Sequence, residues 1–177
     1  MRCFIALEIS EEARRELSRA QSELPKENMK FVEPENLHLT LQFIGEVNED
    51  EIERIKEALG KINFSKFNAS LGKIGFFPDE SYIRVLWASL EPSQVIKDLH
   101  AKIHDSIKSI VNLDNRFESH ITLARIKSIK DREKFLDKIK SINIEKIGFE
   151  AGKFALKKST LTEKGAFYED ISEFNLT

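Results

Sequence analysis

The sequence predicts an α+β fold of two similar lobes related by pseudo-twofold symmetry, with antiparallel or mixed sheets facing a central cleft and helices outside. Two observations indicate this fold. The second half of the chain repeats the first. Strand-like and helix-like segments alternate, but the turns "PDES" and "EKG" are typical of hairpins, which favours α+β over a doubly wound parallel sheet.

The repeat is visible when the second half is laid over the first with an offset of 82 residues. Leu17 then falls on Leu99, and His38 falls on His120. Further along, "INFSKFNASLGKI" meets "INIEKIGFEAGKF" with an offset of 80. Two copies indicate a duplicated lobe and not a solenoid.

The repeat also predicts the domain organisation. The copies cover approximately 1–80 and 82–161, and a closing strand follows at 166–176. Because no Pro/Gly/Ser-rich linker separates them, we expect a single compact bilobal domain over 1–177.

Each copy is expected to contain three strands and two helices. In the first copy, the expected strands are 3–9, 37–44 and 67–77, and the expected helices are 11–24 and the segment after Asn48. Ser10 and Asn48 suit the N-cap position, where a side-chain oxygen accepts from a free backbone N–H. In the second copy, the expected strands are 82–90, 119–126 and 148–161, and the expected helices are 93–110 and 131–141.

The helix expected over 93–110 contains two of the four histidines of the chain, His100 and His104. One leucine and three isoleucines of this helix form its buried stripe. Both histidines flank that stripe, so they are predicted to be exposed or at the boundary. A zinc-protease helix would need a glutamate at Ala101.

Composition limits the class of protein. The chain has 177 residues with a net charge of −2, and no apolar run reaches the ~18–20 residues of a membrane span. The apolar N-terminus is predicted to be a first strand and not a signal peptide. The single cysteine, Cys3, fits a reducing compartment. We therefore expect a cytoplasmic protein with no membrane association and no obligate protein partner, most simply a monomer.

The remaining histidines, His38 and His120, each stand two residues before a threonine, in "HLT" and "HIT". Residues i and i+2 of a strand share a face. His38 and Thr40 therefore lie opposite the leucines around them, and the same holds for His120 and Thr122. Pseudo-twofold symmetry would bring the two polar faces together.

Two histidines and two threonines suit phosphoryl chemistry. One histidine can take a proton from water while the other gives one to the departing oxygen of an in-line displacement. Threonine hydroxyls can donate to non-bridging phosphate oxygens. A strained cyclic phosphate would need neither a metal nor another cofactor.

Two other interpretations of the motifs remain open. A duplication could preserve a purely structural His–Thr pair. Two histidines with a carboxylate such as Glu118 could hold zinc, but the first copy has Asn36 at that position, which disfavours a metal site.

The motifs "HLTLQFIGE" and "HITLAR", with the opening "RCFIALEI" and the closing "STLTEKGAFYEDISEFNL", resemble the two-histidine (2H) phosphoesterase superfamily. The closest resemblance is to its RNA 2′,3′-cyclic phosphodiesterase branch, also called the 2′-5′ RNA ligase family. The resemblance implies hydrolysis of a 2′,3′-cyclic phosphate at an RNA end to a 2′-phosphate, with reversible 2′-5′ ligation as a further activity.

The resemblance also implies roles for individual residues. It makes His38 the proton donor and His120 the proton acceptor, and it assigns phosphate binding to Thr40 and Thr122. It further implies that Phe43 stacks on a base and that Arg125 contacts the ligand. Strict alternation places both on the face opposite the histidines, unless each strand ends or bulges first.

Two alternatives to this activity are consistent with the sequence. The chain could bind nucleotides or RNA ends without turnover. It could also act as a cyclic phosphodiesterase on another small nucleotide.

Overall fold

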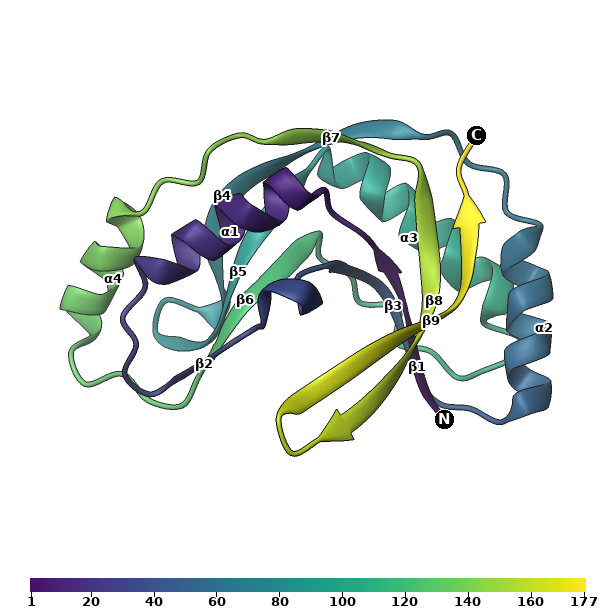
Figure 1. Ribbon diagram of the computed structural model, residues 1–177, viewed down its shortest axis with the longest axis horizontal. Coiled ribbons are helices and arrows are strands. Elements are labelled where there is room, and N and C mark those ends of the chain that lie inside the picture. Colours follow the sequence, from purple (N-terminus) through teal and green to yellow (C-terminus); the bar gives the residue numbers. More distant parts are fainter.

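Four α-helices and nine strands make up the fold in the computed structural model, which describes all residues from 1 to 177 (Figure 1). The helices are α1 (Glu11–Ser22), α2 (Glu49–Gly60), α3 (Ser93–Ile107) and α4 (Arg132–Ser141), with a short 3-10 helix η1 (Pro34–Asn36). The strands are β1 (Arg2–Leu7), β2 (Met29–Phe31), β3 (Leu39–Glu46), β4 (Phe67–Asp79), β5 (Tyr82–Glu91), β6 (His120–Ile126), β7 (Gly148–Ala151), β8 (Lys153–Thr162) and β9 (Gly165–Asn175).

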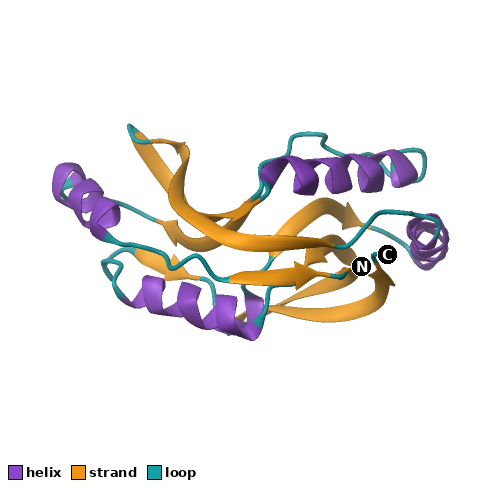
Figure 2. Cartoon of the chain, turned by 90° about the horizontal axis from the view of Figure 1, so that it is seen from above, coloured by secondary structure: helices purple, strands orange, loops and turns teal.

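All strand pairs are antiparallel, and they form one curled sheet in the order β7-β4-β5-β6-β3-β1-β8-β9, with β2 added beside β6. The two central strands, β3 and β6, meet only at Leu39 and Ile121. Seen from above, α2 and α4 lie at opposite ends of the molecule (Figure 2), and both α1 and α3 pack into the main core. This arrangement confirms the predicted α+β fold.

The single strand predicted over 148–161 was wrong, because the chain divides it at Gly152. Strand β7 pairs with β4, whereas β8 pairs with β1 on the far side of the sheet. The chain therefore passes from one half of the sheet to the other at this break. Ala151 and Phe154, on either side of it, both belong to the main core.

Helix caps and buried stripes follow the sequence closely. The Ser10 hydroxyl accepts from the Ala13 N–H at 3.1 Å, and the Asn48 amide oxygen accepts from the Glu51 N–H at 2.9 Å. Helix α3 ends at Ile107, earlier than predicted, with a turn from the Ile110 N–H to the Ile107 carbonyl. A main core of 29 buried residues lies between the helices and one face of the sheet, and a second cluster of eight lies near α4.

Strand β2 and helix η1 were not predicted. Each has only three residues, which is too short for a periodic pattern. They matter because they connect α1 to the first histidine motif and place β2 beside β6.

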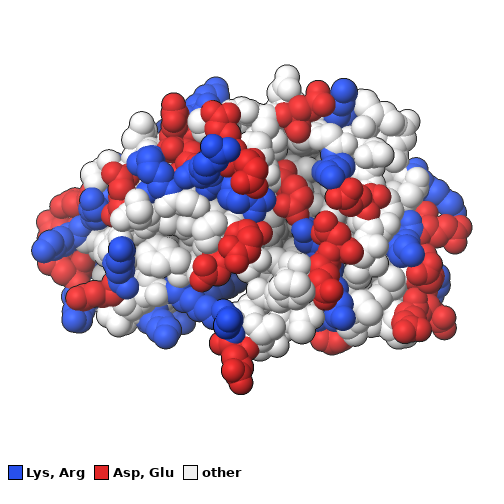
Figure 3. All heavy atoms as spheres, in the orientation of Figure 1, with Lys and Arg blue, Asp and Glu red and all other residues white.

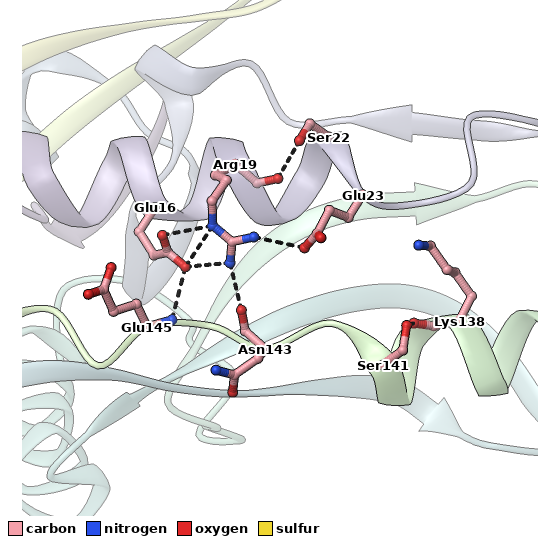
Figure 4. Close-up of polar contacts among 8 residues, drawn as sticks. All are labelled: Glu16, Arg19, Ser22, Glu23, Lys138, Ser141, Asn143 and Glu145. Atoms are coloured by element: carbon pink, nitrogen blue, oxygen red, sulfur yellow. Dashed lines mark hydrogen bonds and ion pairs between the residues drawn. The ribbon is translucent and has the colours of Figure 1, made fainter.

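An ion pair of α1, whose carboxylate is buried, binds the backbone of the segment after α4 (Figure 4). The Glu16 carboxylate, 7% exposed, accepts from the Arg19 guanidinium at 2.6 Å and from the Glu145 N–H at 2.9 Å. Arg19 also donates to the Asn143 carbonyl at 2.6 Å. These contacts fix the segment that leads into β7. No helix of the chain is both long and apolar enough to cross a membrane.

Candidate active site

The two histidine motifs lie on either side of the single contact between β3 and β6. Leu39 and Ile121 are fully buried on the helix-covered face, so the residues that flank them point to the opposite, helix-free face. Antiparallel pairing sets the histidine of each motif beside the threonine of the other. The histidines are then diagonal neighbours across this contact, which in a regular ladder lie about 7–8 Å apart.

Both histidine rings are held in the same way. Nδ1 of His38 lies 2.6 Å from the Asn36 carbonyl oxygen, and Nδ1 of His120 lies 2.8 Å from the Glu118 carbonyl oxygen. Because a carbonyl only accepts, Nδ1 carries the proton in the neutral ring. Nε2 is then free to take or give a proton on the shared face, and that of His38 lies 2.9 Å from the Thr40 hydroxyl.

Aromatic rings surround each histidine. The ring centroids of Phe4 and Tyr168 lie 5.1 and 5.4 Å from the ring centroid of His38. The ring centroids of Phe77 and Trp87 lie 4.9 and 6.2 Å from the ring centroid of His120. The four rings stand in strands β1, β9, β4 and β5, where no pattern in the sequence distinguishes them from other strand residues.

Burial against these rings lowers the pKa of both His38 and His120 below the ordinary histidine value. Desolvation disfavours the charged imidazolium, and this effect is larger than the opposing effect of the carbonyl that accepts from each Nδ1. Both rings are therefore poised in their neutral form in the free protein near pH 7.

A β-bulge turns Phe43 onto the histidine face. On β1, Ala6 and Phe4 are two residues apart, but they pair with Thr40 and Phe43, which are three apart on β3. The extra residue is Leu41. Phe43 thus lies opposite Phe4, whose ring contacts the first histidine, and its side chain shares that face. Phe43 is 68% exposed and available for stacking.

A matching bulge in β6 does the same for Arg125. Trp87 and Val85 of β5 pair with Thr122 and Arg125, which are again three residues apart, and the extra residue is Leu123. The Trp87 ring lies beside the second histidine, so Val85 and Arg125 share its face. Each bulge residue stands three positions after its histidine, and the simple alternation of the sequence misses both.

Buried polar side chains support the two bulges. Nε2 of Gln21 donates to the Leu123 carbonyl at 2.9 Å, and Nδ1 of His100 lies 2.6 Å from the Leu41 carbonyl oxygen. His100 is only 4% exposed, so its predicted exposed or boundary position was wrong. The physical reason is that a bulge carbonyl buried under a helix needs a donor.

The arrangement also bears on the metal hypothesis. Glu118 is exposed and its backbone carbonyl, not its carboxylate, contacts His120. The chain brings no three histidine, cysteine or acidic side chains together at one place.

Comparisons with known proteins place the chain in a family. The model of the family described as "LigT like Phosphoesterase" matches residues 7–87 and 90–168 of this chain. The chain belongs to the LigT-like phosphoesterase family. It is 33% identical, over 98% of its length, to proteins named RNA 2′,3′-cyclic phosphodiesterase from Archaeoglobus fulgidus and Methanocaldococcus jannaschii, of which the matches cover 99% and 100%.

Solved structures agree with this assignment. A crystal structure of a Thermus thermophilus protein superposes with a TM-score of 0.83 at 30% identity, covering 99% of this chain and 98% of that one. The apo structure of E. coli LigT superposes with a TM-score of 0.81 at 23% identity over 99% and 97% of the two chains, and shows the shared fold. The resemblance inferred from the motifs is confirmed, and this LigT-like phosphoesterase is an enzyme.

Proposed function

We propose that this LigT-like phosphoesterase, acting as a monomeric bilobal domain in the cytoplasm, hydrolyses 2′,3′-cyclic phosphates at RNA ends to 2′-phosphates without a metal. The substrate class is that in the names of its relatives. The observation that carries the proposal is the pair of His–Thr motifs on one face, each histidine with its Nδ1 held by a carbonyl.

The proposed reaction breaks the bond between phosphorus and the 3′ oxygen. Nε2 of His120 takes a proton from water as the water oxygen attacks phosphorus, and Nε2 of His38 gives its proton to the departing 3′ oxygen. The Thr40 and Thr122 hydroxyls donate to the non-bridging oxygens as charge accumulates there. Proton donor and acceptor follow the family assignment, because the geometry is nearly symmetric.

This reaction needs His38 protonated, although burial lowers its pKa in the free protein. The negative charge of a bound phosphodiester would favour the imidazolium and offset part of that effect. Arg125 and Phe43, both brought to this face by bulges, would bind the rest of the nucleotide.

The test is product analysis with an RNA end carrying a 2′,3′-cyclic phosphate in EDTA. We expect a 2′-phosphate product, and losses of at least a thousandfold in kcat for both His38→Ala and His120→Ala, with the double variant little worse than either because the pair acts as a unit. Unchanged turnover in both single variants would contradict the proposal. Saturable binding without hydrolysis would instead indicate a binding module, and activity confined to other cyclic nucleotides would indicate a different substrate.

A further inference from the structure

Two cations stand directly opposite each other on the histidine face, at the end of β6 far from the catalytic pair. Lys30 at the centre of β2 pairs with Arg125 of β6. Its neighbours Met29 and Phe31 pack against the second core cluster, so the Lys30 side chain points to the helix-free face. The bulge sends Arg125 to the same face, and both side chains are exposed.

This pairing is unfavourable in the free protein, because like charges directly opposite in a sheet repel. Neither Lys30 nor Arg125 forms an ion pair, whereas nearby Lys130 is paired with Glu27 at 3.4 Å. An edge-strand lysine commonly discourages strand pairing, but that role does not call for an arginine beside it. Lys127 adds a third cation where its N–H donates to the Asn28 carbonyl at 2.8 Å.

Further lysines follow Arg125 in the chain. Residues 125–158 hold 11 Lys and Arg against 5 Asp and Glu, a net +6 in a chain whose total is −2, although much of that segment forms α4, β7 and β8. Lysine and arginine side chains gather at the lower left of the molecule, over β2 and toward the tip of the β8–β9 hairpin (Figure 3).

Lys30 and Arg125 lie at a distance from the histidines that suits a second phosphate of the same RNA strand. Arg125 and His120 pair with Val85 and Ser89 of β5, four ladder steps apart, which is about 13 Å between backbones. The side chains of Lys30 and Arg125 are long enough to reach across part of this gap. Phe43 lies on the other flank, on β3, so base and upstream phosphate would occupy opposite sides.

We infer that Lys30 and Arg125 form a subsite for the 5′-phosphate of the nucleotide that carries the cyclic phosphate. The preferred substrate is then a polynucleotide end or a 5′-phosphorylated nucleotide, and not a nucleoside 2′,3′-cyclic phosphate. This inference rests on the proposed function and deepens it. The cations add binding energy outside the reacting group, so they act mainly through KM.

The experiment measures kcat/KM for three probes: a nucleoside 2′,3′-cyclic phosphate, the same compound with a 5′-phosphate, and a dinucleotide ending in the cyclic phosphate. We expect the wild-type protein to prefer the second and third at least tenfold over the first. Lys30→Ala should reduce that preference at least fivefold. It should also make the logarithmic salt dependence of KM for the dinucleotide shallower by about 0.7, the value for one lost phosphate contact on a single strand.

Lys97→Ala is the matched control, because Lys97 is exposed on α3 and away from this face. Lys30→Arg, which keeps the charge, should retain most of the preference. Equal kcat/KM for all three probes, or a preference that Lys30→Ala leaves unchanged, would overturn the subsite while leaving the proposed function intact. Hydrolysis of none of the probes by the wild-type protein would overturn both.

Discussion

At the scale of residues, the two histidines are alike in how they are held and differ in what surrounds them. Each Nδ1 is occupied by the carbonyl of the residue two positions earlier, which leaves Nε2 for chemistry. His38 is also near the charged groups of Glu8 and Lys157, which are themselves ion-paired, and their effects on its pKa oppose each other. Desolvation has the largest effect on the pKa of both rings.

The pH dependence follows from these lowered pKa values. In the proposed mechanism His120 acts as base and must be neutral, so activity should rise as the pH passes above its pKa. His38 acts as acid and must be protonated, so activity should fall as the pH passes above its pKa. Because both pKa values lie below the ordinary value of about 6.5, kcat/KM should be bell-shaped with a maximum below about pH 6.5. A maximum on the alkaline side of neutrality would contradict this assignment.

Phe43 is a second residue whose role can be measured directly. Stacking on an aromatic contributes about 1–3 kcal/mol per base, so Phe43→Ala should raise KM about five- to a hundredfold with a smaller change in kcat. Tyr82→Ala is the control, because Tyr82 is similarly exposed, at 59%, on the β4–β5 hairpin. Equal effects of the two substitutions would argue against stacking at Phe43.

At the scale of elements, the bulges of β3 and β6 decide which side chains reach the site. A single extra residue in each strand reverses the alternation, so the positions five residues after each histidine return to the histidine's own face. The carbonyls at the bulges accept from Gln21 on α1 and His100 on α3. The helices thus hold the strand irregularities on which the site depends.

Gln21→Leu tests this support. It removes the donor to the Leu123 and Val32 carbonyls, which Nε2 of Gln21 contacts at 2.9 Å each. Buried carbonyls without a donor cost about 1–3 kcal/mol, a loss to be measured from urea unfolding. A shifted bulge would also reduce the contribution of Arg125 to KM. Gln94→Leu, at an exposed position of α3, should change neither property, and equal behaviour of the two variants would refute the role of Gln21.

At the scale of the whole molecule, two links join the halves of the sheet. One is a contact between the central strands, and the other is a chain segment that passes between the outer strands. The central contact is Leu39 with Ile121, and the crossing is the segment from β7 to β8. The Glu16–Arg19 pair anchors the approach to that crossing by binding the backbone at Asn143 and Glu145 (Figure 4). The relative position of the halves, and so of the two histidines, depends on these links.

Glu16→Gln should therefore destabilise the protein as a whole. Hydrogen bonds from Arg19, with that from the Glu145 N–H, lower the pKa of the Glu16 carboxyl against the opposing effect of burial. Its contribution is thus fully present above the ordinary glutamate pKa, about 4.3, and is lost as the pH falls through the lower pKa of the folded state. We expect a loss of about 1–3 kcal/mol at neutral pH, and a difference from wild type that shrinks in acid.

Glu23→Gln provides the comparison for that measurement. Glu23 pairs with the same arginine at 2.8 Å, but its side chain is 44% exposed. Solvent-exposed pairs contribute about 0–1 kcal/mol, so this variant should unfold close to wild type in urea. A Glu23→Gln loss as large as that of Glu16→Gln would show that burial of the carboxylate is unimportant.

The sequence by itself determined most of what local patterns encode. Alternation in "HLTL" and "HITL" predicted which residues are buried, because a strand has only two faces. Cap residues and apolar stripes predicted the helices, and the repeat with its motifs predicted the family.

Only the tertiary structure decided the rest. The bulges that turn Phe43 and Arg125, the burial of His100, and the placing of Lys30 opposite Arg125 all depend on strand register and helix packing between segments far apart in the chain. Register is set by which partners meet, and no local pattern in the sequence contains that information.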